Sequence, residues 1–330
     1  MRLSVLDQSV AVAGRPHEES IRNTVALAQH CEALGYERFW LSEHHNHPTI
    51  VGTAPEIVIA AIASTTGRIR VGSAGIMLPH YSPFKVAEQF RVLDALAPGR
   101  IDLGLGRAPG SDGRTAFALN PQANERPEYF PSDVVDLRAW LHDEPLRNGH
   151  PFASVKVYPQ GPTAPEIWIL GSSDYGAQVA ALLGLPYCYA WFFGNAEVGE
   201  RAIALYKRTY KPSARHPEPH SGLCVWALAA PTMEEAQHHH TSRVLSRIRR
   251  DQGLLGPLLS PEDAAKALAS EDQERIKRIR ERAFVGTGPE VMARIEELKT
   301  QIGVDEMAVV TWAHDENARR QSYSELAKAF

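Results

Sequence analysis

The chain has 330 residues, of which 44% are hydrophobic and 22% are charged. This is the balance of a folded globular protein, and it excludes a disordered chain, a collagen and a coiled coil. The net charge of −4 excludes the basic surface that binding to nucleic acid or to an anionic membrane would need.

The N-terminus and the cysteines predict a cytoplasmic protein. The chain reaches the charged residue Asp7 too early for a secretory signal. The three cysteines, Cys31, Cys188 and Cys224, lie far apart and none has CxxC spacing. We therefore expect buried thiols in a reducing compartment, without a disulfide or a zinc site.

Short apolar segments typical of strands alternate with helical patterns along the whole chain. The expected strands are residues 3–6, 39–41, 69–78, 101–105, 167–170, 187–191, 223–229 and 309–312. The expected helices are residues 18–34, 54–66, 83–96, 132–141, 177–183, 198–210 and 319–328, and a small hairpin is expected at 148–158. The long uncharged segment before Glu197 is broken by Gly184-Leu185-Pro186, which predicts a helix, a turn and a buried strand and no membrane span.

This alternation predicts an α/β protein with a (β/α)8 TIM barrel as a single domain over residues 1–330. Fully apolar strands fit a parallel sheet that is buried on both faces. Residues 233–285 are polar and helical, so we expect a helical insertion between strands 7 and 8. A doubly wound nucleotide-binding sheet is the alternative, but the first 30 residues lack a GxGxxG sequence, and Gly104-x-Gly106-x-x-x-Gly110 has the wrong spacing.

In a barrel, chemistry belongs to the loops that follow the carboxyl ends of the strands. Gly171-Ser172-Ser173 would follow strand 5 and open a helix, where hydroxyls, main-chain N–H groups and the helix dipole favour an anion. Arg107 would follow strand 4 and supply a permanent charge for a phosphate. An ordinary helix N-cap explains the serines equally well at this stage.

Histidines follow strand 2. His45-x-His47 could chelate a metal, but the ends of strands 5 and 6 offer no further histidine, so we expect no metal site. An imidazole beside an organic cofactor is the other functional interpretation, with His44 its best candidate, while loop hydrogen bonding suffices for His45 and His47. His238-His239-His240 lies in a polar helical segment and is expected to be a solvated face.

Several short motifs, in this order and spacing, resemble the bacterial luciferase-like flavin monooxygenases, close to the alkanal-monooxygenase-like branch. The resemblance runs nearly end to end. It is carried by Ser42-Glu43-His44-His45, Val71 to Pro79, Ala87-Glu88-Gln89, Leu93-Asp94 followed by Gly99-Arg100, Gly104-x-x-Arg107, Gly184-Leu185-Pro186 and Val285 to Glu290.

The resemblance implies a barrel that binds FMN at its carboxyl-terminal end. It implies a non-prolyl cis peptide at Ala74–Gly75 that supports the flavin ring, together with Ser73. It places the phosphate among Arg107, Gly171, Ser172, Ser173 and Tyr175, assigns Trp191 to the flavin site, and makes His44 the catalytic residue. Gly75 stands where luciferase has alanine and is expected to loosen ring placement, and Gly106 stands where luciferase has cysteine and is expected to leave the pocket emptier. The insertion matches the family's mobile lid, with Gly253 and Gly256 as hinges.

The implied function is a monooxygenase that uses O2 and reduced FMN from a separate flavin reductase. The expected substrate is small and hydrophobic, such as an aldehyde, and the aromatic residues Tyr81, Trp191, Phe192 and Phe193 are expected to line its entrance. The family also implies a homodimer. Two alternatives stay open: an oxidoreductase of the same fold that uses the deazaflavin F420 for hydride transfer, and a non-catalytic flavin-binding subunit. A hydrolytic metal barrel is a more distant one.

Overall fold

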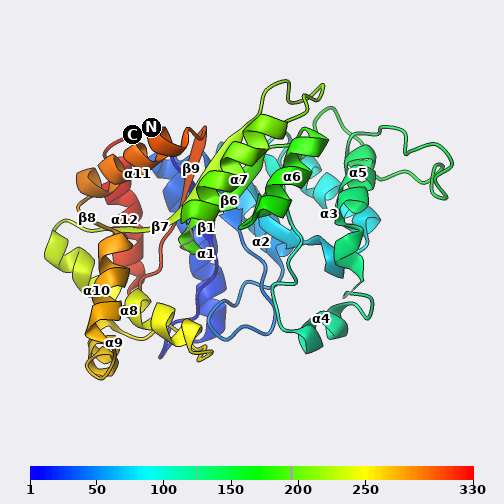
Figure 1. The fold of residues 1–330 in the computed structure, drawn as a ribbon. Coiled ribbons are helices and arrows are strands. Elements are labelled where there is room, and N and C mark those ends of the chain that lie inside the picture. Colours follow the sequence, from blue (N-terminus) through cyan, green and yellow to red (C-terminus); the bar gives the residue numbers. More distant parts are fainter. Residues whose placement is uncertain (124, 194–195) are drawn as a thin grey trace. The chain divides into compact units, whose positions relative to one another are not determined.

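The computed structural model describes residues 1–123, 125–193 and 196–330 (Figure 1). The strands are β1 (Ser4–Asp7), β2 (Arg38–Leu41), β3 (Arg70–Met77), β4 (Ile101–Gly106), β5 (Glu166–Gly171), β6 (Tyr187–Ala190), β7 (Ser221–Ala229), β8 (Phe284–Gly286) and β9 (Glu306–Val310). The helices are α1 (His17–Leu34), α2 (Pro55–Thr65), α3 (Pro83–Leu96), α4 (Gly113–Leu119), α5 (Phe130–Leu141), α6 (Asp174–Leu183), α7 (Ala196–Thr209), α8 (Met233–Asp251), α9 (Pro261–Leu268), α10 (Gln273–Arg282), α11 (Gly288–Ile302) and α12 (Glu316–Ala327).

The fold is the predicted (β/α)8 barrel. The strand order is β6-β5-β4-β3-β2-β1-β9-β7-β8, and β6 also pairs with β7, so β1 to β7 and β9 form a closed ring. The pairs β1–β9, β3–β4, β4–β5 and β5–β6 are parallel. The alternative of an open doubly wound sheet is therefore wrong.

Contacts within the chain group it into two units. Unit 1 contains residues 1–39, 47–52 and 223–330, and unit 2 contains residues 40–46 and 53–222. The prediction of a single domain is not tested by this grouping and stays a prediction.

In unit 2, buried polar groups fix the ends of the strands. The carboxylate of Asp102, in β4, is fully buried. It accepts hydrogen bonds from Trp40 Nε1 at 2.8 Å and from Arg70 Nε at 2.9 Å. A buried carboxylate is costly unless it is paired, so these bonds hold β2, β3 and β4 in one arrangement.

The glycines that follow α1 and α6 have a left-handed backbone conformation. Gly35 follows α1 with φ of 85°, and Gly184 follows α6 with φ of 62°. A Cβ on Gly184 would also lie 2.6 Å from the carbonyl oxygen of Lys211. Both the left-handed backbone and this close approach exclude a larger residue, which explains the turn predicted at Gly184-Leu185-Pro186.

In unit 1, the predicted insertion forms three helices with a core of their own. Val244, Leu245 and Ile248 of α8 pack with Ala264 and Leu268 of α9, and Ile276 of α10 joins the same cluster. The short strand β8 then pairs with β7, so the expectation of no strand in residues 233–285 is wrong at Phe284 and Val285. No structural observation tests the predicted lid role, or Gly253 and Gly256 as its hinges.

The predicted hairpin at 148–158 is wrong, because this segment closes on itself in turns. Ala153 N bonds to His150 O at 3.1 Å, and Val155 N bonds to Phe152 O at 2.9 Å. His150 Nε2 lies 3.1 Å from an Asp136 carboxylate oxygen of α5, which ties the segment to that helix. These local bonds use the main-chain groups that a second strand would need.

All three cysteines are free and buried, as predicted. Among the described residues, no helix is long and apolar enough to cross a membrane.

Candidate functional site

All the predicted site residues belong to unit 2 and lie in or after the strands β2 to β6. Parallel strands share their carboxyl ends, so the residues that follow them gather at one end of the barrel. His44 follows β2, Ser73, Ala74 and Gly75 lie within β3, Arg107 follows β4, Gly171 ends β5, Ser172, Ser173 and Tyr175 come between β5 and the first turn of α6, and Trp191 follows β6.

Arg107 presents a free guanidinium at this end of β4. The side chain is exposed, and its guanidinium carbon lies 3.8 Å from the centre of the Tyr175 ring. Within the described part of unit 2, Arg107 has no hydrogen bond or ion pair. Stacking on an aromatic ring holds the planar group in place while its N–H donors stay available, which suits binding of a phosphate.

The serines beside this stack do not cap the helix with their side chains. Ser173 occupies the N-cap position of α6 but makes no side-chain capping hydrogen bond. Ser172 and Ser173 are both exposed, and Tyr187 uses the carbonyl of Ser173 and not its hydroxyl. The alternative of an ordinary N-cap therefore does not describe this segment, and both hydroxyls can bond to an anion.

The acidic residue of this turn is already paired. Asp174 Oδ2 accepts a 2.8 Å hydrogen bond from Arg201 Nε of α7. This pairing reduces the repulsion that a carboxylate would exert on a phosphate at the helix N-terminus.

The β3 segment has the predicted cis peptide between Ala74 and Gly75. Ser73 is buried and donates to the carbonyl of Gly104 at 2.9 Å, whereas Ala74 is only half-buried. A Cβ on Gly75 would lie 2.6 Å from the Gly104 oxygen and 2.9 Å from Leu170 Cδ1. Packing between β3 and β4 thus accounts for this glycine, and its expected effect on the placement of the flavin ring stays a prediction.

Met77 occupies the space beside Gly106, so the expectation of an emptier pocket there is wrong. A Cβ on Gly106 would lie 2.8 Å from the terminal methyl of Met77. The long methionine side chain fills the space that a larger residue at position 106 would use.

Glu43 is the centre of a hydrogen-bond network that the sequence did not predict. Its buried carboxylate accepts from the Tyr81 hydroxyl at 2.7 Å, from His45 Nε2 at 2.7 Å and from Met77 N at 3.1 Å. Burial and the neighbouring Glu43 raise the pKa of Tyr81, so Tyr81 remains a proton donor. The network links the loop after β2, which carries His44, to the end of β3, the strand that contains the cis peptide. The sequence feature that could have revealed this network is an acid placed between a strand and two histidines. Tyr81 was expected to line an apolar entrance, but its hydroxyl donates to Glu43.

His44 is half-buried beside this network. Its Nδ1 lies 3.3 Å from the Ser42 hydroxyl oxygen. The contact with Ser42 orients the imidazole ring, and an imidazole can donate or accept a proton near neutral pH. Its catalytic role stays a prediction.

The aromatic residues after β6 are unequally exposed. Trp191 is half-buried and close to Gly199 of α7, where a Cβ would lie 2.6 Å from its ring. Phe193 is 50% exposed, and Phe192 is half-buried. Contact of Trp191 with a flavin stays a prediction.

The other histidines have structural surroundings. His47 Nδ1 accepts from the main-chain N–H groups of Thr49 and Ile50, at 3.2 and 3.0 Å, as expected of a loop histidine. His240 is 2% exposed, so the predicted solvated face is wrong for this member of the triplet. Over the ranges that the structure describes, no group of three or more His, Cys, Asp or Glu could hold a metal ion.

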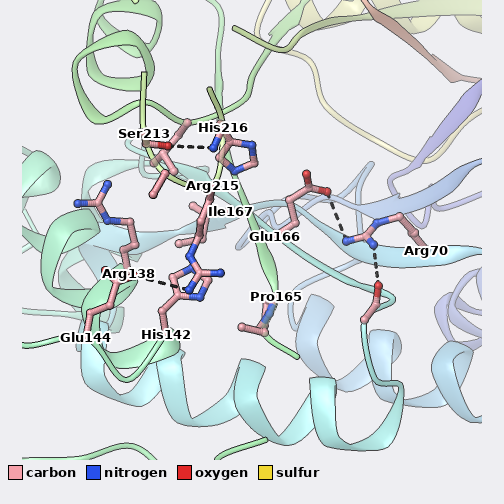
Figure 2. Close-up of a pocket in the computed structure, with 14 residues that line it drawn as sticks. Arg70, Arg138, His142, Glu144, Pro165, Glu166, Ile167, Ser213, Arg215 and His216 are labelled. Carbon is pink, nitrogen blue, oxygen red and sulfur yellow. Dashed lines mark hydrogen bonds and ion pairs between the residues drawn. The ribbon is translucent and has the colours of Figure 1, made fainter. Parts of the chain in front are cut away.

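A cavity lies at the amino ends of the unit 2 strands, opposite to the ends that carry the candidate site residues. It has a volume of about 470 Å³, and Arg70, Arg138, His142, Glu166 and Arg215 are among its lining residues (Figure 2). Arg70 lies 3.4 Å from Glu166, and Arg138 donates to the carbonyl of Leu183 at 3.0 Å. Residues at this end of a barrel usually serve stability, and these pairings fit that role.

The family model for the luciferase-like monooxygenases matches residues 1–306. The chain belongs to the luciferase-like monooxygenase family. The resemblance carried by the short motifs is thereby confirmed over nearly the whole chain, and relatives of this family that act as monooxygenases make the protein an oxygenase enzyme.

Similar proteins cover the full length of the chain. It is 42% identical to YwcH of Bacillus subtilis, a protein of uncharacterised function, over 99% of this chain and 98% of that one. It is 34% identical to the N-acetyl-S-alkylcysteine monooxygenase of the same organism, over 100% and 98% of the two chains. The crystal structure of apo-MsnO8 superimposes with a TM-score of 0.88 at 36% identity, covering 100% of this chain and 98% of the other.

Two more distant solved structures share the fold. The oxygenating component of 3,6-diketocamphane monooxygenase of Pseudomonas putida, solved with FMN, has a TM-score of 0.72 at 19% identity and covers 99% and 97% of the two chains. An F420-dependent secondary alcohol dehydrogenase has a TM-score of 0.68 at 16% identity, covering 98% of each chain. The first of these neighbours was solved with FMN, and the second depends on F420.

Proposed function

We propose that this protein is an FMN-dependent monooxygenase that inserts one oxygen atom of O2 into a small hydrophobic substrate. The observation that carries the proposal is the exposed guanidinium of Arg107, stacked on Tyr175 and free of any acid among the described residues. A fixed cation beside two uncommitted serine hydroxyls and a helix N-terminus is what a phosphate group requires.

The residues fit FMN at both ends of the cofactor. Arg107, Ser172, Ser173 and the first N–H groups of α6 would hold the phosphate, and the half-buried Ala74 of β3 would lie against the ring. Bound reduced FMN supplies the two electrons that allow one oxygen atom of O2 to enter the substrate while the other leaves as water. The protein's own part is to position the reactants and to exclude water.

His44 would move the proton that this reaction needs. Its ring is held near Ser42, and the loop that carries it is fixed by the Glu43 network. An imidazole titrates near neutral pH and can therefore donate and accept a proton within one catalytic cycle.

The substrate class has two sources of support. The exposed Phe193 and the half-buried Trp191 and Phe192 offer an apolar aromatic surface that suits an aldehyde or another hydrophobic compound. The relative at 34% identity is named for oxygenation of N-acetyl-S-alkylcysteines, which adds thioethers to the candidates.

We further propose that a separate flavin reductase supplies reduced FMN, and that the protein is a homodimer in the cytoplasm. The reductase follows from the chemistry, since no dinucleotide-binding motif for a nicotinamide cofactor is present in the sequence. The homodimer follows from the family resemblance, and sedimentation velocity tests it.

The test of function is oxygen consumption with chemically reduced FMN. The purified protein is mixed with reduced FMN and O2, and panels of aldehydes and thioethers are screened for products that carry one added oxygen atom. Substrate-dependent formation of such a product supports the proposal. Hydride transfer from reduced F420 without O2 consumption would replace it, and tight flavin binding without any turnover would indicate a non-catalytic subunit.

A further inference from the structure

Outside the candidate flavin site, unit 1 contains a buried arginine with no acid beside it. Arg243, in α8, is 8% exposed. Its guanidinium carbon lies 4.7 Å from the centre of the Trp312 ring and 5.6 Å from that of Trp226. Across residues 1–123, 125–193 and 196–330 it makes no hydrogen bond or ion pair, and its Nε is buried without a partner.

The charges around Arg243 do not compensate for its own. Burial first, then Arg250 and Arg247, lower the pKa of Arg243 to about 9, and Asp251 opposes them. Asp251 is already bound by Arg250 at 3.0 Å and by Arg275 at 2.8 Å. At neutral pH the guanidinium is therefore charged, and a buried charge without a counter-ion is unfavourable. Stacking on indole rings offsets only part of that cost.

Two neighbours of Arg243 also have buried polar atoms without a hydrogen-bond partner among the described residues. The Trp226 Nε1–H group is buried and unpartnered among the described residues, as is His240 Nδ1. The His240 ring stacks on Trp226, with centroids 5.0 Å apart and planes at 30°. An indole N–H can only donate, so Arg243 and Trp226 both present donors for which the described residues supply no acceptor.

This cluster extends to the carboxyl ends of the unit 1 strands. Trp312 follows β9, and its Nε1 donates at 3.0 Å to Gln8 Oε1, which follows β1. A ligand that reaches Arg243 beside Trp312 therefore lies at the carboxyl ends of the unit 1 strands β1 and β9.

We propose that Arg243 and Trp226 bind the carboxylate of an organic acid with an apolar body, at a site in unit 1. One guanidinium and one neutral N–H donor match the single charge and two oxygens of a carboxylate. The indoles of Trp226 and Trp312 make the surroundings apolar, which suits a ligand whose remainder is hydrocarbon or thioether.

The test compares acids with their uncharged amides. N-acetyl-S-methylcysteine and hexanoate, and the amide of each, are titrated into the full chain with and without FMN. Binding is followed by tryptophan fluorescence and by calorimetry, neither of which needs turnover. We expect at least one acid to bind about tenfold or more tightly than its amide, as a charge-assisted hydrogen bond implies. Equal affinity for acid and amide, or no binding of any acid, would overturn the proposal.

Variants assign the preference to Arg243. R243M should bring the affinity for the acid down to that for the amide, whereas R249M, on the same helix, should keep the preference. If R243M does not fold, W226F retains the ring, loses the N–H donor and should reduce the preference by a few-fold. An acid preference that survives these changes would leave Arg243 as a purely structural, ring-stacked residue.

This experiment can fail separately from the proposed function. Oxygenation of neutral compounds with no acid preference would retain the monooxygenase and refute the carboxylate site. Acid binding that depends on Arg243, in a protein that consumes no O2 with reduced FMN, would retain the site and refute the monooxygenase.

Discussion

The carboxylate of Glu43 accepts a 2.7 Å hydrogen bond from the hydroxyl of Tyr81, a residue 38 positions further along the chain. The same carboxylate also accepts from His45 and from the main chain of Met77. One buried side chain thus connects the loop that carries His44 with the end of the strand that carries the cis peptide. The positions of two candidate site elements depend on this acid.

Replacing Glu43 by Gln should destabilise the protein. An amide nitrogen would face a donor where a carboxylate oxygen now accepts, which should lower the free energy of unfolding by about 1–3 kcal/mol. Y81F removes a single donor and should cost less. Urea denaturation measures both, with E88Q, which changes an exposed pair with Lys85, as the control expected within about 0.5 kcal/mol of the wild type. An E43Q variant as stable as E88Q would contradict the role of the network.

Replacing Arg107 by Ala should weaken FMN binding. Loss of a charged hydrogen bond to the phosphate corresponds to about 1.5–3 kcal/mol, or a Kd raised roughly 10- to 150-fold. R208A removes another exposed arginine of unit 2 and should leave the Kd unchanged. Quenching of FMN fluorescence gives the Kd values.

The stack on Tyr175 can be tested in the same assay. Y175F keeps the ring under the guanidinium and should bind FMN nearly as well as the wild type. Y175A should raise the Kd for FMN, but by less than R107A does. Equal Kd values for Y175F and Y175A would show that the ring does not position Arg107.

Replacing His44 by Ala should reduce turnover without loss of FMN. Proton transfer by a positioned side chain contributes about 10²- to 10⁴-fold to a rate, and kcat should fall by an amount in this range. The Kd for FMN, measured by fluorescence quenching, is the control and should stay unchanged. Wild-type kcat in H44A would remove His44 from the mechanism.

Replacing Gly104 by Ala should destabilise the barrel. A Cβ there would lie 2.2 Å from the carbonyl oxygen of Ser73, so β3 and β4 would have to separate. Such overpacking costs about 1–3 kcal/mol or more. Gly113 has nothing within 4 Å of an added Cβ, so G113A is the matched control and should leave the melting temperature nearly unchanged. A G104A variant with the same melting temperature as G113A would mean that β3 and β4 are less closely packed than this distance indicates.

Stability should fall as the pH falls below about 6.5, partly through His142. Burial first, then Arg215, Arg138 and Arg91, lower the pKa of His142 to about 4. Between about pH 6.5 and pH 4 the unfolded chain therefore binds a proton that the folded chain refuses, and the free energy of unfolding decreases. H142Q cannot take up this proton and should lose less stability than the wild type over the same interval, as urea denaturation at pH 7, 5.5 and 4 would measure. Parallel curves for the two proteins would contradict the depressed pKa.

The sequence determined the barrel, most helices and the candidate phosphate site. Helix periodicity and capping residues are local signals, and residues 83–96 form α3 as predicted. The site residues could be located because parallel strands share their carboxyl ends, so a residue's place after its strand suffices to bring it to the reactive face. Motif order added the cis peptide at Ala74–Gly75.

The tertiary structure decided which hydrogen-bond partners and packing contacts each side chain has. The sequence could not predict that Glu43 would collect donors from three segments, that His240 would be buried against Trp226, or that residues 148–158 would close in turns bound to α5. It could not show that an added Cβ at Gly75 would meet Gly104 and Leu170, or that one at Gly106 would meet Met77. Hydrogen bonding and close packing act between residues that are distant along the chain, and such partners become neighbours only when the chain has folded.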